Sequence, residues 1–565
     1  MPKIETSAKY FYTQLGKTLT DSELEEILPV AKAELDDHDG DVLKIELNDT
    51  NRPDLWSPSG IVRQLKSYWD IEAPLYDFFS TEEETFESDD RVMIVDESIT
   101  PIRPYGIGFA ARGHNSSAED MEALIQSQEK ICWNFGQKRR SIAMGIYRSK
   151  LITYPVHYRG ADPDTTKFVP LGMEEELSLR EIITVHPKGK EYGHIHANDP
   201  LFPYLHDDKN QTLSFPPVIN SASIGAVEEG DAELFVEFSG TELKDLLLAA
   251  AIIACDMADM GYEILPVKVI FPEETEYGKE ITVPYYFQEP ASCSVEEIHK
   301  TLGDPLTNDE ITTGLKRMGI YAIVDDERVY ATVPEWRNDF LHAVDLVEDV
   351  MIGHGLGNFE PVMPADFTVG RLTGAEELGR KIKDLMVGLG FQEMMYNYLG
   401  SKKEYIENMR YPKEKCIIIS NPMSENYEVV RPSIIPSLLE SESVSAHAPF
   451  PHRIFEVGKV AYIDDSTNSG TITRNKLGFL ASDSVMGYNE VSTFVSTLFY
   501  FLSTEYTLAD VGEDGRFIPG RCAKIMVDGK KVGIFGEVHP QVLENWKSDT
   551  PTVVCEVDLD SLLGE

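Results

Sequence analysis

Five acidic residues lie close together in EWRNDFLHAVDLVEDVM, residues 335–351. Four of them are spaced six, three and one apart: Asp339, Asp345, Glu348 and Asp349. On a helix the last three would share one face and repel one another by roughly 0.2–0.5 kcal/mol per pair. A hard cation such as Mg²⁺ would turn this repulsion into attraction, since it prefers carboxylate oxygens. The alternative is a solvated helix face near the positive end of the helix dipole, and the pattern alone favours neither.

Apolar residues fill the other face of the same predicted helix, among them Leu346, Val347 and Val350. They can be buried against the helix's own domain, so we expect the acidic face to be free and to point at a partner molecule. Magnesium usually takes one or two protein carboxylates and keeps several waters. Four acids therefore exceed the need of one ion, and some of them would only support the direct ligands.

Three other stretches resemble ligand sites but have simpler interpretations. HPKGKEYGHIHAND contains His186, His194 and His196 without a clear carboxylate or cysteine ligand, which favours a loop without metal. LDDHDGDVLKIE begins with Leu35, which cannot bind calcium, so it predicts a turn that enters a strand. GHGLGNFE follows a predicted helix rather than a strand, which argues against a dinucleotide-binding loop.

The chain is strongly acidic. It has 51 Lys and Arg against 96 Asp and Glu, a net charge of -45. A protein that binds nucleic acid unaided needs a basic face to displace counterions. Either nucleic acid is not a ligand, or a basic partner supplies most of the attraction.

The cysteine pattern and the apolar runs point to a cytoplasmic protein. The 6 cysteines include no C-x-x-C pair, so the sequence predicts neither a zinc site nor a disulfide framework. The longest apolar run, LLLAAAIIAC at 246–255, is too short for a membrane span and predicts a buried helix. We expect a reducing cytoplasmic location and no membrane association.

The 565 residues are too many for one core, and the element pattern divides them into α+β regions. In the first half we expect a helix over 21–35, a strand over 42–47, a strand over 233–240 and a helix over 241–260. Capping boxes at Ser294 and Thr307 predict two short helices, followed by a hairpin, which is a winged-helix-like layout. The expected domains are residues 1–90, 91–268, 289–362 and 363–565.

Several motifs resemble the β subunit family of phenylalanyl-tRNA synthetases, in order from about residue 40 to 548. NRPDLWSPSGIVRQL resembles its first domain, and HPKGKEYGHIH and FPPVINSASIGAVEEGDAELFVEFSGT resemble its tRNA-editing domain. VPEWRNDFLHAVDLVEDVMIGHGLGNFEP resembles the segment that closes its helix-pair domain. NPMSENYEVVRPSIIPSLLES, HRIFEVGKV and GIFGEVHPQVLENW resemble its synthetase-like core. The short N-terminal half and the lack of a C-terminal anticodon-binding domain resemble the archaeal/eukaryotic type.

The resemblance implies a multidomain α+β fold with an α/β editing domain, a winged-helix-like helix-pair domain and an antiparallel class II synthetase-like core. The family binds Mg²⁺ at the boundary with its α subunit through acids spaced six, three and one apart. By this resemblance the magnesium ligands are Asp339, Asp345, Glu348 and Asp349, the last standing where Glu is common. Within the editing domain, the candidates for the pocket are Asn220 and Glu237, with a loop cap as the alternative role of Asn220.

The synthetase-like core departs from the pattern of an active class II enzyme. Such enzymes hold the ATP phosphate with an Arg before x-Glu on one strand and with a second Arg after a Gly-rich turn. Here the corresponding positions carry Glu456-Val457 and Glu537-Val538. Without the guanidinium donors, charge on the phosphate is not stabilised. We therefore expect no residue of this chain to be catalytic for aminoacylation.

The resemblance implies a β subunit of phenylalanine–tRNA ligase. With a catalytic α subunit, in an (αβ)₂ heterotetramer, it would attach phenylalanine to tRNA(Phe) with ATP as substrate and Mg²⁺ as cofactor. It would also hydrolyse mischarged Tyr-tRNA(Phe). Two alternatives stay open: a stand-alone deacylase of mischarged tRNA that uses residues 91–268, and a non-catalytic interaction scaffold.

Overall fold

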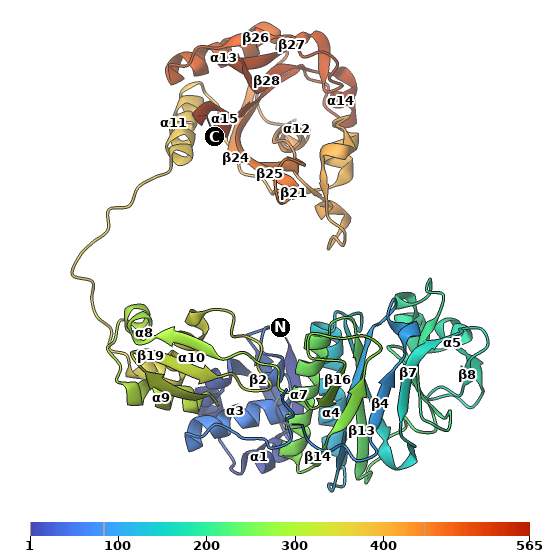
Figure 1. Ribbon diagram of the computed structural model, residues 1–565. Helices are drawn as coiled ribbons and strands as arrows, with labels where there is room; N and C mark the ends of the chain where they lie inside the picture. The colour runs from blue at the N-terminus through green and yellow to red at the C-terminus, as the bar shows by residue number, and fades with distance from the viewer. Residues whose placement is uncertain (1, 83–84, 446, 565) are drawn as a thin grey trace. The chain divides into compact units, whose positions relative to one another are not determined.

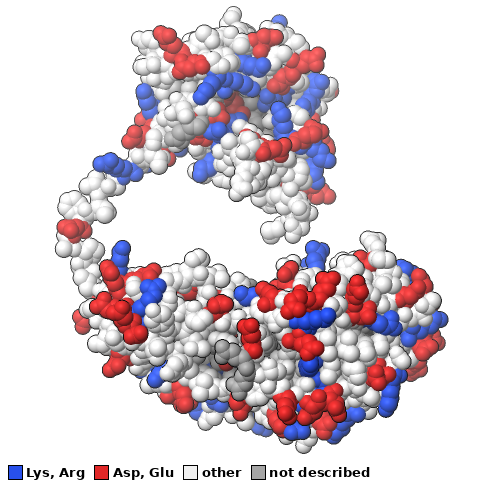
Figure 2. All heavy atoms as spheres, viewed as in Figure 1, with Lys and Arg blue, Asp and Glu red and all other residues white. Residues whose placement is uncertain are grey.

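The computed structural model describes residues 2–82, 85–445 and 447–564. They form two compact units, Met1–Val362 and Met363–Glu565, each with its own helices and sheets (Figure 1). The chain is therefore a multidomain α+β protein, as the sequence predicted. In Figure 2 acidic side chains are spread over the visible face of both units, in line with the net charge of -45. Among the described residues, no helix is long and apolar enough to cross a membrane.

The N-terminal part of the first unit is a small antiparallel sheet with order β1-β3-β2 and three helices. These elements are β1 (Lys3–Ser7), β2 (Ala33–Asp39), β3 (Val42–Leu47), α1 (Ala8–Leu15), α2 (Asp21–Ile27) and α3 (Pro58–Asp70). The strand at 42–47 is confirmed, and Gly40, at φ 62°, makes the turn that enters it. The predicted helix over 21–35 is wrong beyond Ile27. A 3₁₀ turn that contains Pro29 follows, because proline lacks the N–H that an α-helix needs.

Two sheets make up the middle of the first unit, with orders β14-β5-β13-β6 and β12-β11-β10-β7-β4-β15-β16. The strands of the smaller sheet are β5 (Tyr105–Arg112), β6 (Ile142–Arg148), β13 (Glu233–Gly240) and β14 (Glu263–Leu265). Those of the larger sheet are β4 (Val92–Val95), β7 (Val156–Ala161), β10 (Phe202–His206), β11 (Thr212–Phe215), β12 (Ile219–Asn220), β15 (Val267–Ile270) and β16 (Glu280–Val283). The central strand β13 pairs antiparallel with β5 and β6 and coincides with the predicted strand.

Helices cover these sheets, with bounds α4 (Ala118–Lys130), α5 (Leu179–Val185), α6 (Pro187–Tyr192) and α7 (Leu243–Met260). The apolar run 246–255 lies in α7, which packs on β5 and β13 and is buried along most of its length. The predicted loop around His186 is wrong, because this stretch forms α6 and a 3₁₀ turn, Gly193–Ile195. His186 caps α6 and Pro187 occupies its first turn, both of which favour a helix start.

The end of the first unit is the predicted pair of helices followed by a hairpin, with one added strand in a sheet of order β17-β19-β18. The elements are β17 (Ala291–Ser294), α8 (Val295–Leu302), α9 (Asn308–Arg317), β18 (Tyr321–Asp325), β19 (Arg328–Thr332) and α10 (Ala343–His354). The acidic stretch of the opening forms α10. Its apolar residues Leu346, Val347 and Val350 are buried in the core of this region, as predicted.

The second unit is built on a seven-stranded sheet with order β20-β24-β25-β29-β28-β27-β26, antiparallel except for the β20–β24 pair. Its strands are β20 (Gln392–Glu393), β24 (His452–Ile463), β25 (Thr471–Ser482), β26 (Thr507–Ala509), β27 (Phe517–Val527), β28 (Lys530–Val538) and β29 (Thr552–Asp558). Its helices are α11 (Gly374–Gly388), α12 (Ile435–Val444), α13 (Tyr488–Leu502), α14 (Pro540–Asn545) and α15 (Leu559–Leu563). A small sheet of order β21-β23-β22 joins β21 (Leu399–Gly400), β22 (Ile417–Ile418) and β23 (Val429–Val430).

Candidate functional site

A pocket of about 170 Å³ lies where β6 and β13 of the smaller sheet meet β11 and β12 of the larger one. Both predicted editing candidates, Asn220 on β12 and Glu237 on β13, line it. Residues that are far apart in the sequence thus reach one cavity from two sheets. The other polar side chains of its wall are Gln128, Arg139, Tyr147, Lys188 and Ser214.

Glu237 is the buried acid of this pocket, with only 2% of its surface exposed. The hydroxyl of Tyr147 lies 3.1 Å from Glu237 Oε2 and 2.8 Å from Ser214 Oγ. The other oxygen, Oε1, has no hydrogen-bond partner among the described residues. Burial raises the pKa of Glu237 to about 7, although Tyr147 and the buried Arg103 act in the opposite direction. A carboxyl that titrates near neutral pH can both give and take a proton.

Asn220 is fixed on the opposite wall. Its side-chain Nδ2 donates to the carbonyl oxygen of Ile146 at 3.3 Å. Gly225 packs so closely that any side chain at that position would collide with Asn220. The amide is therefore held in one orientation at the pocket, where it can hydrogen-bond to a polar group that enters.

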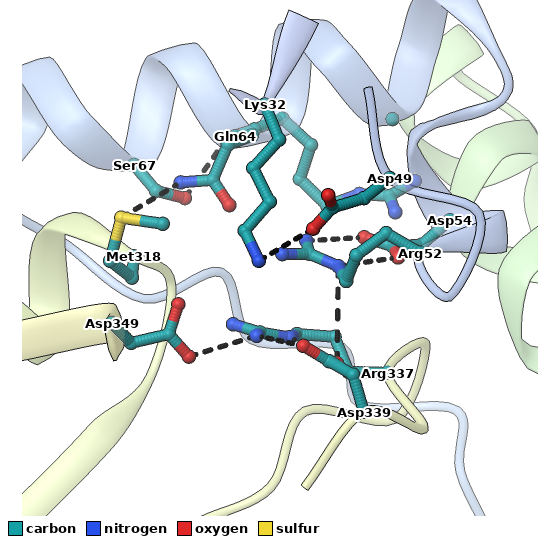
Figure 3. A network of polar contacts seen from close by, with 12 residues as sticks. Lys32, Asp49, Arg52, Asp54, Gln64, Ser67, Met318, Arg337, Asp339 and Asp349 are labelled. Atoms are coloured by element: carbon teal, nitrogen blue, oxygen red, sulfur yellow. Dashed lines mark hydrogen bonds and ion pairs between the residues drawn. The ribbon is translucent and has the colours of Figure 1, made fainter. Parts of the chain in front are cut away.

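Two carboxylates of the acidic stretch, Asp339 and Asp349, lie in a network of ion pairs (Figure 3). Arg337 donates to both oxygens of Asp339, at 3.0 and 2.6 Å, and its Nη2 lies 2.8 Å from Asp349 Oδ2. Arg52 makes the same two-pronged pair with Asp54, and its Nε lies 3.9 Å from Asp339. The guanidinium groups are buried together with the carboxylates, and the network joins the segment before α3 to the segment before α10.

The two buried acids of this network have opposite pKa shifts. Burial alone would raise the pKa of Asp339, but the charges of Arg337 and Arg52 hold it well below its usual range. Asp349 is more deeply buried, and burial raises its pKa although Arg337 acts against this shift. Asp339 is therefore ionised across the physiological range and needs its arginine partners.

The other two acids of the stretch also have partners within the chain. Asp345 Oδ2 accepts hydrogen bonds from the backbone N–H groups of Leu341 and His342, which caps α10. Glu348 lies 3.1 Å from Lys32 Nζ, which also contacts Asp49. The expectation of a free acidic face is wrong for Asp339 and Asp349, which are buried against Arg337, whereas Asp345 is half-buried and Glu348 stays exposed beside Lys32.

The chemistry of these four side chains suits one Mg²⁺ ion, because carboxylate oxygens are hard ligands. Their arrangement does not: Arg337 lies between Asp339 and Asp349, where a shared cation would sit. Across the described residues, no group of three or more His, Cys, Asp or Glu side chains could hold a metal ion. The four acids in this arrangement therefore do not form a single coordination shell.

The three histidines singled out in the sequence have separate partners. His186 accepts from the backbone N–H of Lys188, and its Nε2 lies 3.1 Å from the carbonyl oxygen of Leu171. His194 Nδ1 lies 2.9 Å from the carbonyl oxygen of Glu191, and His196 pairs with Asp199 at 2.8 Å. His186 and His194 therefore bond to the ends of α6, whereas His196 bonds to Asp199 beyond the 3₁₀ turn.

In the second unit, an arginine that the sequence did not single out neutralises Glu456 on β24. Arg431, which follows β23, donates to both carboxylate oxygens at 2.8 and 2.9 Å, and both side chains are buried. Glu537 on β28 pairs with Arg521 at 2.8 Å. The guanidinium of Arg431 is thus used inside the chain and is not available to a phosphate.

Arg52, Arg337 and Arg431 are the functional candidates that sequence reasoning missed. Arg52 and Arg337 share one signal, an arginine two residues before an aspartate, in Arg-Pro-Asp and Arg-Asn-Asp. A guanidinium and a carboxylate at this spacing can make the two-pronged pair that is seen twice here. For Arg431 the sequence near Glu456 holds no comparable signal.

Comparisons with known proteins agree with one another. Residues 291–356 match the family model "tRNA synthetase B5 domain", and residues 360–559 match "Phenylalanyl tRNA synthetase beta chain CLM domain". The "Phenylalanine--tRNA ligase beta subunit" of Borreliella burgdorferi (strain ZS7) is 48% identical over 567 residues, with 100% of both chains covered. This chain belongs to the phenylalanine–tRNA ligase β subunit family. The protein of the same name from Borrelia turicatae (strain 91E135) is 46% identical, also over 100% of both chains.

A solved structure supports the family assignment for the first unit. It is an N-terminal fragment of the phenylalanyl-tRNA synthetase β-subunit from Pyrococcus horikoshii, with a TM-score of 0.59 and 34% identity. The match covers 63% of this chain and 100% of the fragment. The relatives that match over the full chain are bacterial, so assignment to an archaeal/eukaryotic type is not supported by them.

Proposed function

We propose that this chain is the non-aminoacylating β subunit of a cytoplasmic phenylalanine–tRNA ligase. With a catalytic α subunit, in an (αβ)₂ heterotetramer, it attaches phenylalanine to tRNA(Phe) at the expense of ATP. The observation that carries the proposal is the 48% identity to a phenylalanine–tRNA ligase β subunit over the whole length of both chains.

Within this proposal the domains are residues 1–90, 91–268, 289–362 and 363–565. The helix pair and hairpin of α8, α9, β18 and β19 support a winged-helix-like third domain. The antiparallel sheet of the second unit supports a class II synthetase-like core. We take that core to be silent, because Glu456-Val457 and Glu537-Val538 stand where arginines would hold the ATP phosphate; the nearby Arg431 is paired with Glu456.

The second part of the proposal is hydrolytic editing of Tyr-tRNA(Phe) in the pocket of Asn220 and Glu237. A polar amide that bonds the tyrosine hydroxyl selects against phenylalanine, which lacks it, by up to about 10⁴–10⁵. Hydrolysis adds water to the ester carbonyl, releases tyrosine and returns the hydroxyl of the terminal ribose to the tRNA. Glu237, with a pKa of about 7, can exchange the proton that this reaction moves.

The proposed magnesium site has two carboxylates, not four. Asp339 and Asp349 are held by Arg337, whereas Asp345 and Glu348 lie one helical turn apart on the less buried side of α10. A hydrated Mg²⁺ needs one or two protein carboxylates. Next to the α subunit it would use Asp345 Oδ1, because Oδ2 accepts two backbone N–H groups, and it would compete with Lys32 for Glu348. This ion would support assembly of the subunits and takes no part in the hydrolysis.

The test is reconstitution of the chain with its α subunit. Charging of tRNA(Phe) with phenylalanine should need both chains, and charging by either chain alone would contradict the subunit role. In the assembled enzyme, Asn220→Ala should slow clearance of Tyr-tRNA(Phe) by tenfold or more, at unchanged charging with phenylalanine. If Tyr-tRNA(Phe) is cleared as fast as by the wild type, Asn220 is not part of the editing site. Turnover of Tyr-tRNA by the chain without α would favour the stand-alone deacylase.

A further inference from the structure

A second hollow, of about 240 Å³, adjoins the candidate editing pocket. Its wall includes Trp133, Arg139, Lys188 and Tyr192, together with Glu129 and Glu191. Arg139 and Lys188 also line the pocket of Asn220 and Glu237, so the two cavities share one wall. Whatever occupies the second hollow thus lies directly beside the candidate hydrolytic site.

The shared wall is a rigid one. Arg139 Nη1 donates to the carbonyl oxygen of Pro217 at 3.0 Å, and its guanidinium lies 4.3 Å from the centre of the Tyr192 ring. Arg103, which is fully buried, donates at 2.8 Å to the carbonyl oxygen of Arg140. Residues 137–140 form a loop that is held at both of its arginines. Arg139 bonds it to the editing pocket, and the backbone carbonyl of Arg140 bonds it to Arg103 in the core.

The backbone of this loop has an unusual conformation. Three successive residues, Gln137, Lys138 and Arg139, have φ values of 50, 58 and 67°. Non-glycine residues in the left-handed region are strained, and runs of them persist where the surroundings impose the geometry. The conformation brings Lys138 back over Trp133, with Nζ 5.2 Å from the ring.

Trp133 is the exposed aromatic of the hollow. It is 46% exposed, although indole is among the side chains that gain most from burial. Exposed aromatic side chains beside Lys and Arg are how proteins stack unpaired bases and hold the phosphates between them. Arg139 and Lys138 provide these cations; Glu129 and Glu191 also line the hollow, and Glu191 pairs with Lys188 at 3.1 Å.

We propose that the hollow lined by Trp133 and Arg139, together with Lys138 over the Trp133 ring, binds the single-stranded 3′ end of an acylated tRNA. A terminal base stacks on Trp133, and the adjoining phosphates contact Lys138 and the guanidinium of Arg139. The acyl group then enters the pocket of Asn220 and Glu237 across the shared wall. This inference rests on the editing function proposed above and assigns its nucleic-acid contact to residues outside the hydrolytic pocket.

The test uses the assembled enzyme and Tyr-tRNA(Phe). Trp133→Ala should raise the KM of deacylation about five- to 150-fold, the loss of one base stack, with kcat within threefold of the wild type. Lys138→Ala should raise KM and flatten its dependence on salt, because one phosphate contact is lost. The matched controls are Trp69→Ala and Lys17→Ala, a second lysine–tryptophan pair at 3.2 Å, in the N-terminal domain. An unchanged KM in both Trp133→Ala and Lys138→Ala would overturn the inference.

A binding experiment separates this inference from the editing function itself. The probe is a fluorescent single-stranded RNA that ends in CCA, measured by anisotropy with the assembled enzyme. If the RNA binds more weakly to the Trp133→Ala enzyme than to the Asn220→Ala enzyme, RNA binding in the hollow is supported. This holds even if neither the variants nor the wild type hydrolyse Tyr-tRNA. Equal binding to wild type and Trp133→Ala refutes it, even if the wild type deacylates well. Charging with phenylalanine should stay within twofold in every variant and shows that the subunits are folded and assembled.

Discussion

Glu237 is the residue on which the chemistry of the pocket depends most. Its carboxyl is buried beside Tyr147, and burial raises its pKa to about 7 from the 4.5 of a free glutamate. The folded state thus binds a proton that the unfolded chain releases at lower pH. The contribution of Glu237 to stability is fully present below pH 4.5 and is lost as the pH rises through 7.

Glu237→Gln should remove this part of the pH dependence. Between pH 5 and pH 8 the wild type should lose roughly 2–3 kcal/mol more unfolding free energy than the variant, measured by urea denaturation at both pH values. Glu233→Gln, at the exposed start of the same strand, is the matched control and should follow the wild type. A variant with the same pH dependence as the wild type would show that Glu237 titrates normally.

The sequence could indicate Asn220 and Glu237 as a pair but not their setting. Both stand in a stretch that resembles the editing domain, and Glu237 lies in the strand predicted over 233–240. The contact with Tyr147 and the role of Gly225 depend on how β6, β12 and β13 meet. That meeting is a matter of tertiary packing, which no local pattern encodes.

The network of Arg52 and Arg337 fixes the position of α10. Sequence reasoning found the helix, its buried face and its acids, because these follow from a period of 3.6 residues. It assigned the acidic face to a partner because two of the neutralising residues, Lys32 and Arg52, lie far away in the chain, and because the pairing of Arg337 with Asp339 and Asp349 depends on how the segment before the helix folds. Lys32 and Arg52 come from the N-terminal domain, and Arg337 precedes the helix.

Arg337→Ala should destabilise the first unit strongly. It leaves Asp339 and Asp349 buried without their partner, which costs about 3–5 kcal/mol when one member of a buried ion pair is removed. The measurement is the urea midpoint of the chain, followed by tryptophan fluorescence, where Trp336 adjoins the site. Arg112→Ala breaks an exposed pair with Glu263 and, as a control, should cost less than about 1 kcal/mol. Equal effects of the two variants would show that the network adds no stability.

The net charge of -45 on the whole chain opposes binding of a tRNA, which is also strongly negative. The chain's own basic sites are small and local, such as the hollow at Trp133. A long-range field that repels phosphate makes binding of tRNA by this chain alone weak. Basic surface on the α subunit would remove this obstacle, and the acidic side of α10 is a place where such a surface can dock.

Replacement of Asp345 by Asn and of Glu348 by Gln tests two proposals at once: that the α subunit docks on α10, and that these two carboxylates hold Mg²⁺. The change keeps the shape and removes two charges, while Arg337 keeps its contacts with Asp339 and Asp349, so the fold should persist. We expect sedimentation of α with the variant to show weaker assembly, and a chelator to weaken assembly of the wild type but not of the variant. Asp325→Asn with Glu296→Gln removes the same charge from exposed positions of the same domain and should assemble as the wild type does. If assembly of the Asp345 and Glu348 variant matches the wild type with and without chelator, the acids of α10 serve only the contacts within the chain.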